Sequence, residues 1–359
     1  MTGAWRCDVV GSFAWRTCTV RWPKIVNDLA HDVGDHAGAL DDLAREIAGG
    51  VVPVLDVLEG DDRDRFVDVS AAVGQPWTSL PWYVGEAYLY ARIRSVVGWS
   101  AHGADPFFAA KQREEATLSA DDVDTDLGSL LVRTLWGNRG DLSLPSAKAH
   151  TDEDDDNLLV DDRGKAIELL RSARRVGVIL DNAGLELFRD LQLVRHLVDN
   201  GIAVTLFAKD RPFFVSDAMP VDIERTRRRL RRDAGAIDVI ADPFFTGPSF
   251  FNREQAPAAL WRTLATFDAL IVKGDANYRR LVGDRPWRAT DRDPFSMVVD
   301  LPAPAIAVRT LKAEVLVGAD AAVCDDVAAH SPDWLVSGRF GVVQVAAGDN
   351  VVDSETNDT

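Results

Sequence analysis

The fold is decided by the stretch Val176-Gly177-Val178-Ile179-Leu180-Asp181-Asn182-Ala183-Gly184-Leu185-Glu186-Leu187. Its first five residues are apolar apart from one glycine and predict a short buried strand, which ends directly before Asp181 and Asn182. A helical pattern follows from about Leu185 to Asn200, and Gly201 ends it. In open α/β sheets, ligands bind outside the carboxyl ends of the strands. The stretch therefore predicts a strand that presents a carboxylate and an amide to a ligand.

The helix that follows adds a second feature to the same place. The first turn of a helix has backbone N–H groups without intrahelical partners, and it carries the positive end of the helix dipole. Beside Asp181 and Asn182, this turn is a favourable position for an anion such as phosphate.

Composition limits the classes of protein to which the chain can belong. Its 359 residues, 47% of them hydrophobic, are enough to bury a substantial core in one large domain or two. The 57 acidic residues exceed the 40 basic residues and give a net charge of −17, which opposes binding to nucleic acid or to an anionic membrane. No apolar run is long enough to span a bilayer, and the N-terminus lacks the pattern of a signal peptide. The three scattered cysteines suit a reducing compartment, so we expect a soluble cytoplasmic protein.

The organisation of the chain changes near its middle. Residues 1–150 are predicted to form a mostly helical domain, with helical patterns at 25–47, 81–97 and 121–136. Residues 151–165 contain the run Asp152-Glu153-Asp154-Asp155-Asp156 and are interpreted as an acidic linker, and residues 349–359 as a polar tail. Between them, residues 166–348 alternate β-branched runs with amphipathic helices, which predicts an α/β fold with a mainly parallel sheet. The expected strands lie near 176–180, 203–208, 236–240, 269–272, 305–308 and 342–345.

Polar side chains follow two of these strands in a pattern that suits a metal. Asp181 and Asn182 follow the first strand, and Asp217 lies beyond the second, in Phe214-Val215-Ser216-Asp217. Together they offer two carboxylates and an amide oxygen, the hard ligands that Mg²⁺ or Mn²⁺ prefers. Asp and Asn at strand ends also serve as helix caps and turn formers, and the residues alone leave both interpretations open.

Two further clusters carry groups suited to a phosphorylated substrate. In Lys273-Gly274-Asp275-Ala276-Asn277-Tyr278-Arg279, Asp275 and Asn277 can bind sugar hydroxyls, while Arg279 offers a planar fork to phosphate oxygens. In Arg309-Thr310-Leu311-Lys312, two cations flank a hydroxyl residue, and Lys312 would neutralise charge on a transferring phosphoryl group. The structural alternative is a capped strand-to-helix turn with Arg279 in a surface ion pair.

Three motifs have mainly structural interpretations. Glu86 and Tyr90 lie four residues apart on one helical face, which is typical of aromatic packing combined with a surface ion pair. The basic run 225–232 is interpreted as the exposed face of a helix, and the turn at 136–143 either caps a helix or lines a cleft.

Taken together, these strings resemble the metal-dependent damage-control phosphatases, also called the family with domain of unknown function 89. The resemblance is strongest to the sugar-phosphate phosphatase branch with an Arg-Thr-x-Lys motif, here Arg309-Thr310-Leu311-Lys312. It extends to Arg21-Trp22-Pro23, to the Glu86 helix and to Gly338-Arg339-Phe340-Gly341, so it covers nearly the whole chain.

The resemblance implies a helical N-terminal domain packed on an α/β domain with a Rossmann-like sheet, which has helices on both faces. It implies a divalent metal, one of Mg, Mn, Co or Ni, at the positions of Asp181, Asn182 and Asp217. Catalysis is expected from Asp181, Asp217 and Lys312, and substrate binding from the following positions: Asn182, Asp275, Asn277, Arg279, Arg309 and Lys312. The expected partner is a small phosphorylated metabolite, such as a fructose or other hexose phosphate.

Other functions remain open from the sequence. One is methyl transfer from S-adenosylmethionine to protein carboxylates, although such sites of Rossmann type usually have a glycine-rich first turn, which Asp-Asn-Ala-Gly is not. Another is a non-catalytic regulator that binds sugar phosphates. The sequence fixes neither the oligomeric state nor the native metal, and it does not decide whether water or a carboxylate is the nucleophile.

Overall fold

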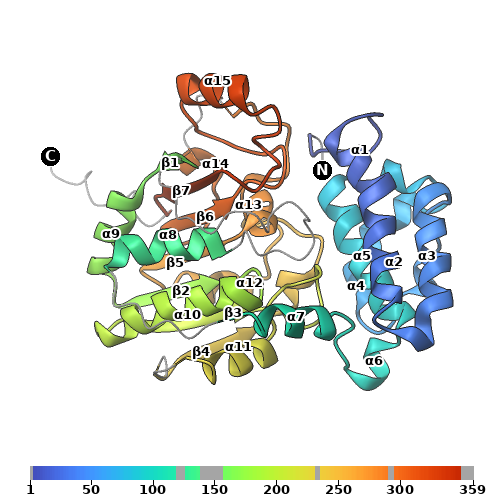
Figure 1. Ribbon diagram of the computed structural model, residues 1–359, viewed down its shortest axis with the longest axis horizontal. Helices are drawn as coiled ribbons and strands as arrows, with labels where there is room; N and C mark the ends of the chain where they lie inside the picture. Colours follow the sequence, from blue (N-terminus) through green and yellow to red (C-terminus); the bar gives the residue numbers. More distant parts are fainter. Residues whose placement is uncertain (1–2, 119–125, 138–156, 231–234, 290–294, 349–359) are drawn as a thin grey trace, which may run out of the picture.

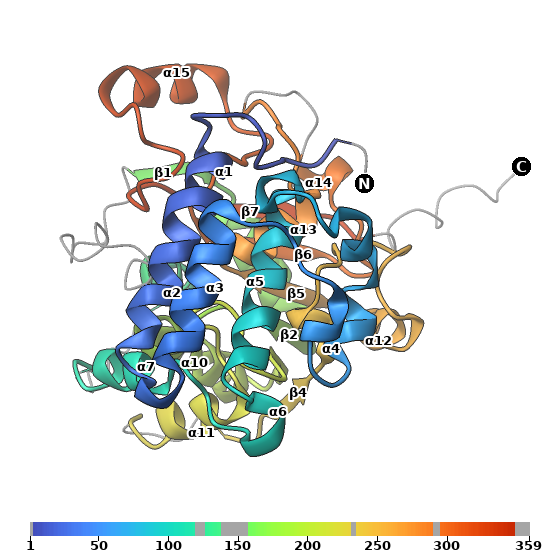
Figure 2. The same cartoon turned by 90° about the vertical axis from the view of Figure 1, so that its right-hand side faces the viewer.

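The computed structural model describes residues 3–118, 126–137, 157–230, 235–289 and 295–348. A helical N-terminal region lies beside an α/β unit (Figure 1), and in the second view its helices stand in front of the sheet (Figure 2). The predicted acidic run, the polar tail and the turn beyond Gly137 lie outside the described residues. The predicted α/β class with a helical N-terminal region is confirmed.

The α/β unit is built on one sheet of seven strands in the order β1-β7-β6-β5-β2-β3-β4. Strands β6, β5, β2, β3 and β4 are parallel to one another, while β7 is antiparallel to β6 and β1 pairs parallel with β7. The strands are β1 (Leu158–Asp161), β2 (Arg175–Ile179), β3 (Ala203–Ala208), β4 (Asp238–Ala241), β5 (Ala269–Lys273), β6 (Ala305–Thr310) and β7 (Gly341–Ala346).

Helices cover both faces of this sheet. Successive residues of β2, such as Val178 and Ile179, belong to two different hydrophobic cores because successive side chains of a strand point to opposite faces. A strand covered on both faces reads as a continuous apolar run, which is why β2 could be recognised in the sequence. The helices of this unit are α7 (Phe108–Glu115), α8 (Leu127–Gly137), α9 (Arg163–Ser172), α10 (Gly184–Asp199), α11 (Pro220–Arg227), α12 (Ala258–Leu264), α13 (Asp275–Val282), α14 (Phe295–Val298) and α15 (Ala321–His330).

The helical region is organised around one buried helix, α5. Every residue from Trp82 to Arg94 is buried, and a helix that is covered on all sides is a core element rather than a surface one. The elements of this region are α1 (Phe13–Arg16), the π-helical turn η1 (Thr17–Arg21), α2 (Trp22–Ala30), α3 (Ala37–Gly49), α4 (Asp62–Arg65), α5 (Trp82–Val96) and α6 (Trp99–His102).

The structure differs from the sequence expectations in three details. The sheet has a seventh strand, β1, inside the stretch interpreted as a linker; only four residues long and at the sheet edge, it gives a weak sequence pattern. The helical pattern at 25–47 is two helices, because the chain turns at His31–His36. Helix α8 packs on α10 and the sheet, not on the helical region.

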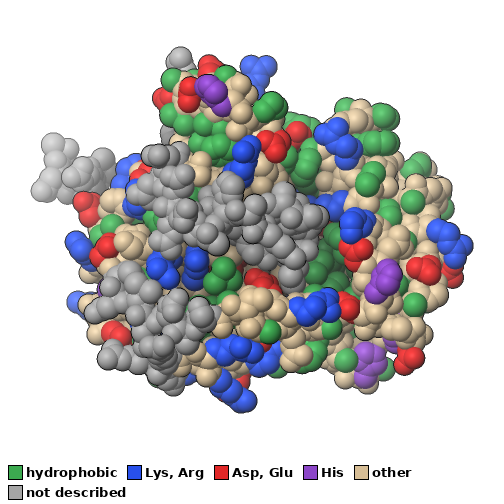
Figure 3. Space-filling view, in the orientation of Figure 1, with side chains coloured by type: hydrophobic (Ala, Val, Ile, Leu, Met, Phe, Trp, Pro, Cys, Tyr) green, Lys and Arg blue, Asp and Glu red, His purple; other side chains and the backbone are tan. Residues whose placement is uncertain are grey.

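Two surface properties bear on possible partners. Within the described residues, no helix combines the length and apolar character needed to cross a membrane. On the face seen in Figure 3, basic and acidic side chains are interspersed, and the described part of that face carries no continuous basic surface.

Candidate active site

The candidate site lies where the order of the strands reverses. The chain runs from β2 outward to β3 and β4, then returns to place β5 on the other side of β2. The loops after β2 and β5 therefore leave the sheet in opposite directions and open a crevice between them, as in other open α/β sheets. Asp181 follows β2 on one side of this crevice, and Asp275 follows β5 on the other.

Backbone hydrogen bonds bring Asp217 to the end of β2. The loop after β3 turns back, so that Ala183 N donates to Ser216 O at 2.7 Å and Ala218 N donates to Asp181 O at 2.8 Å. These bonds make a short antiparallel bridge between Asn182 and Asp217. Asn182 and Ser216, which are 34 positions apart in the sequence, are therefore in contact. The three residues expected to bind a metal lie side by side.

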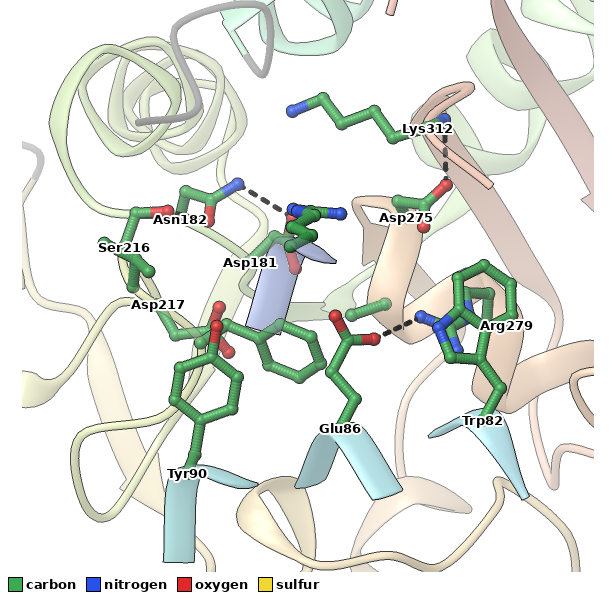
Figure 4. Close-up of a pocket in the computed structure, with 14 residues that line it drawn as sticks. Trp82, Glu86, Tyr90, Asp181, Asn182, Ser216, Asp217, Asp275, Arg279 and Lys312 are labelled. Carbon is green, nitrogen blue, oxygen red and sulfur yellow. Dashed lines mark hydrogen bonds and ion pairs between the residues drawn. The ribbon is translucent and has the colours of Figure 1, made fainter. Parts of the chain in front are cut away.

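These residues share a pocket with groups from the rest of the chain (Figure 4). The α/β unit contributes six of the predicted site residues, and the helical region closes the opposite side. The lining residues are Arg21, Trp82, Glu86, Tyr90, Asp181, Asn182, Phe214, Val215, Ser216, Asp217, Asp275, Ala276, Arg279 and Lys312.

The carboxylates in this pocket are crowded in a way that suits a bound cation. Asp181 is 4% exposed and Asp217 is 1% exposed. Burial, followed by repulsion from Glu186 and Asp217, holds the pKa of Asp181 well above its usual range. Lys209 compensates part of the charge, with its Nζ 3.0 Å from Asp217 Oδ2. A divalent cation between the carboxylates would remove the remaining repulsion, so the residues present fit a hard metal ion.

The candidate metal ligands are few, and their chemistry determines how many coordination positions a bound cation would keep open. Among the described residues, no group of three or more His, Cys, Asp or Glu side chains is arranged to hold a metal ion. The candidate set has two carboxylates, and its third oxygen donor is the amide of Asn182. A cation held this way would keep several positions for water or substrate oxygens, as Mg²⁺ usually does in phosphate-transferring sites.

Asp275 and Lys312 also line the pocket, on the side of β5 and β6. Asp275 begins α13, and its Oδ1 accepts a hydrogen bond from the backbone N of Lys312 at 3.1 Å. The Lys312 side chain extends across the top of the pocket in Figure 4. The structure therefore brings a cation close enough to the candidate metal ligands for its charge to act on Asp181.

Asn277 and Arg309, also predicted to bind substrate, do not line the pocket. Asn277 Nδ2 donates to the backbone carbonyls of Leu180 and Lys273, at 3.1 and 2.8 Å. Arg309 is fully buried; its Nε donates to Asp275 Oδ1 at 2.9 Å, and Nη2 donates to Ala313 O at 3.1 Å. Both side chains hold the backbone and Asp275 in position, a role that a motif by itself does not distinguish from substrate contact.

A family model described as the damage-control phosphatase ARMT1-like domain matches residues 17–327 of this chain. The chain belongs to that family. Damage-control phosphatase ARMT1 from Danio rerio is 30% identical over 334 residues, a match that covers 76% of this chain and 74% of the relative. The protein of that name from Rattus norvegicus is 26% identical, with coverage of 93% and 96%. A crystal structure of a DUF89 family protein from Pyrococcus horikoshii shares the fold, with a TM-score of 0.51 at 15% identity over 90% of this chain and 97% of that one.

In this member of the family, the helical region supplies a wall of the pocket that sequence reasoning did not assign. Trp82, Glu86 and Tyr90 are spaced four residues apart along α5, so they lie on one face of the helix and reach the pocket together. Arg21 comes from the last position of η1, and π-helical turns occur frequently at functional sites. The four-residue spacing was visible in the sequence, where it was interpreted as a helix face with a surface ion pair. In the structure, Glu86 is 2% exposed.

Arg279 lines the pocket, but its guanidinium is held by carboxylates. Nη1 donates to Glu86 Oε2 at 2.7 Å, while Nε and Nη2 donate to the two oxygens of Asp284 at 2.7 and 3.1 Å. The guanidinium carbon also lies 3.7 Å from the centre of the Trp82 ring. The expected surface ion pair is thus a buried one, and three of the five N–H donors of this guanidinium are bonded to carboxylates of this chain.

The first turn of α10 is likewise occupied. Leu185 N donates to Oε1 of Glu114 at 3.2 Å, and Glu114 belongs to α7. A Cβ on Gly184 would lie 2.3 Å from that carboxylate, so the contact depends on glycine. A protein carboxylate therefore holds the position that the sequence suggested for phosphate, and Lys312 is the better-placed group for an anion.

Proposed function

We propose that this protein is a metal-dependent phosphatase that hydrolyses small phosphomonoesters, in particular sugar phosphates such as fructose or other hexose phosphates. We assign it to the branch with the Arg-Thr-x-Lys motif on the basis of residues 309–312. The observation that carries the proposal is the convergence of Asp181, Asn182 and Asp217 on one pocket that also receives Lys312. The relatives that are named damage-control phosphatases support the reaction class.

Asp181, Asn182 and Asp217 would hold the divalent cation, which supplies a Lewis acid for a phosphoryl oxygen. Lys312 extends over the top of the pocket, with its ammonium group on the side of Asn182, and would neutralise charge on the equatorial phosphoryl oxygens. Lys209 Nζ lies 3.0 Å from Asp217 Oδ2, where it balances the carboxylate charge, and it donates to Leu180 O at 2.8 Å. These groups are fixed before substrate arrives, and such electrostatic preorganisation is the usual source of catalysis in phosphoryl transfer.

The opposite wall suits the organic part of a sugar phosphate. Glu86 presents a carboxylate to the pocket and Tyr90 a phenol, and both groups can bind hydroxyls. The charge of Glu86 is paired with Arg279, so the preference for a monoester with neutral hydroxyl groups rests on the hydrogen-bonding groups of Glu86 and Tyr90. The cavity itself measures about 40 Å³, space for a few waters, so a hexose phosphate requires side chains at its rim to move.

The test is phosphate release from a panel of phosphorylated metabolites, with Mg²⁺, Mn²⁺, Co²⁺ and Ni²⁺ supplied in turn and no methyl donor. We expect metal-dependent release that is abolished in Asp217→Asn and retained in Asp333→Asn, an exposed aspartate in a surface ion pair. Binding of a sugar phosphate without release would make the protein a regulator instead. Carboxyl methylation that needs S-adenosylmethionine, without any phosphate release, would replace the proposal with methyl transfer.

A further inference from the structure

We propose that Glu186 and Lys273 are positioning residues that fix the amide of Asn182 with its oxygen toward the metal site. Asn182 Nδ2 donates to Asp181 Oδ2 and to Glu186 Oε2, each at 2.9 Å. On the other side of the amide, Oδ1 accepts a hydrogen bond from Ser216 Oγ at 2.6 Å. The amide is therefore contacted at both its nitrogen and its oxygen.

These contacts leave the amide a single orientation. A carboxamide nitrogen has two hydrogens, and here each hydrogen meets a carboxylate oxygen, which accepts but cannot donate when ionised. In the reversed orientation, the amide oxygen would face two carboxylates and both hydrogens would lose their acceptors. An amide oxygen has two lone pairs, and Ser216 uses one of them. The other is available for a cation, which is the requirement for Asn182 to act as a ligand.

Glu186 is itself held by a buried lysine. Lys273 Nζ lies 3.2 Å from Glu186 Oε1 and 3.2 Å from Asp190 Oδ1, and it donates to Thr134 O at 2.7 Å. Lys273 is fully buried, and Glu186 and Asp190 are each 1% exposed. The ammonium group thus makes one hydrogen bond and two ion-pair contacts, and one oxygen of Glu186 lies beside the lysine while the other faces Asn182.

The two acidic partners of Lys273 provide a matched comparison. Glu186 and Asp190 are equally buried and lie at the same distance from the same ammonium group, but only Glu186 is hydrogen-bonded to Asn182. Asp190→Asn therefore controls for loss of an acidic partner of Lys273, while Glu186→Asp, which keeps the negative charge beside Asp181, separates charge from hydrogen bonding to Asn182. Orientation of the Asn182 amide involves Glu186 alone.

The experiment measures the affinity of the metal-free full-length protein for Mn²⁺ by calorimetry, without substrate. Glu186→Gln should weaken binding by about ten- to a hundredfold, the usual range for outer partners of metal ligands. Glu186→Asp keeps the charge but shortens the reach to Asn182, so it should weaken binding as well. Asp190→Asn should change affinity by less than about threefold. Circular dichroism of each metal-free variant checks that it folds.

A second set of variants, made in Asn182→Asp, separates orientation of the amide from any other role of Glu186. In Asn182→Asp, the two carboxylate oxygens are equivalent and no orientation has to be chosen. The further penalty of Glu186→Gln in this background should fall to that of Asp190→Asn. An equal penalty in both backgrounds, or wild-type affinity in Glu186→Gln and Glu186→Asp, would overturn the inference.

The inference rests on the metal site of the proposed function, but not on the substrate or the reaction. Because the calorimetry uses Mn²⁺ alone, the inference about Glu186 and the proposed phosphatase activity can fail separately. Tight wild-type binding with no phosphate release would reject the phosphatase and leave the role of Glu186 measurable. No Mn²⁺ binding by the wild-type protein would reject both.

Discussion

Arg279 of α13 donates a hydrogen bond to Glu86 of α5 at 2.7 Å, and this buried contact joins two parts of the chain that are 193 residues apart. Asp284 binds the other edge of the same guanidinium and also accepts a hydrogen bond from Tyr83 N at 3.0 Å. The helical region and the α/β unit therefore share one buried charge network at the rim of the pocket.

Arg279→Met should destabilise the fold by about 3–5 kcal/mol, because it leaves Glu86 and Asp284 buried without their common cation. Glu86→Gln should cost less, since Asp284 still neutralises Arg279. Urea unfolding measures both values. Arg45→Met, in an exposed pair with Asp42, is the control and should cost less than about 1 kcal/mol. Equal costs for Arg279→Met and Arg45→Met would contradict the role of this network.

Gly274→Ala should displace Asp181 and thereby weaken metal binding. A Cβ at Gly274 would lie 1.9 Å from Asp181 Oδ2, so the carboxylate has to move. Gly201→Ala is the matched control, because Gly201 has a similar φ of +81° but no atom within 4 Å of the added Cβ. Both variants carry the backbone strain of a positive φ, which is greater at Gly274 because its φ of 84° and ψ of 171° lie in a region that only glycine ordinarily adopts. Only Gly274→Ala should lose affinity for Mn²⁺ in calorimetry. Identical affinities would show that Asp181 is not the group that the glycine accommodates.

Lys312→Ala should lower kcat/KM for phosphate release by about a hundredfold or more, the effect of removing one group that stabilises transition-state charge. Affinity for Mn²⁺ should not fall, because Lys312 is a cation whose charge acts on Asp181 and it is not one of the candidate ligands. Lys165→Ala, at an exposed ion pair, is the control and should leave the rate unchanged. A full rate in Lys312→Ala would exclude this lysine from charge stabilisation.

The stability of the metal-free protein should depend on the protonation of Asp190. Burial, opposed by Lys273 and reinforced by Glu186, raises the pKa of Asp190 from 3.8 to about 7. The folded state then holds a proton that the unfolded chain releases at lower pH, so this contribution is present below about pH 4 and is lost as the pH rises through 7. Asp190→Asn removes the titration. Its unfolding free energy relative to wild type, from urea titrations at pH 4.5 to 7.5, should therefore increase with pH, and a constant difference would refute the assignment.

The sequence predicted β2, β3, β5 and β6 well because they are buried and read as apolar runs between turns, whereas the edge strand β4 is largely exposed. It also placed Asp181, Asn182, Asp217, Asp275 and Lys312 at the ends of those strands, and all five line one pocket. Parallel strands bring their carboxyl ends to one edge of the sheet, so local sequence is sufficient to group such residues. Strand β1 was missed because it has only four residues and lies at the sheet edge, so its sequence pattern is weak.

Only the tertiary structure shows which polar side chains are available to a ligand and which ones bind other parts of the chain. Three residues look like substrate ligands in a motif: Arg279, Asn277 and Arg309. In the structure, Arg279 donates to Glu86 and Asp284. Asn277 donates to backbone carbonyls, and Arg309 donates to Asp275. The same applies to the first turn of α10, where Glu114 lies in place of an external anion. A residue type and its place at a strand end follow from the local chain, but the partner that satisfies a buried charge comes from elsewhere in the sequence. Packing of the helical region against the sheet therefore determined which groups remain for a ligand.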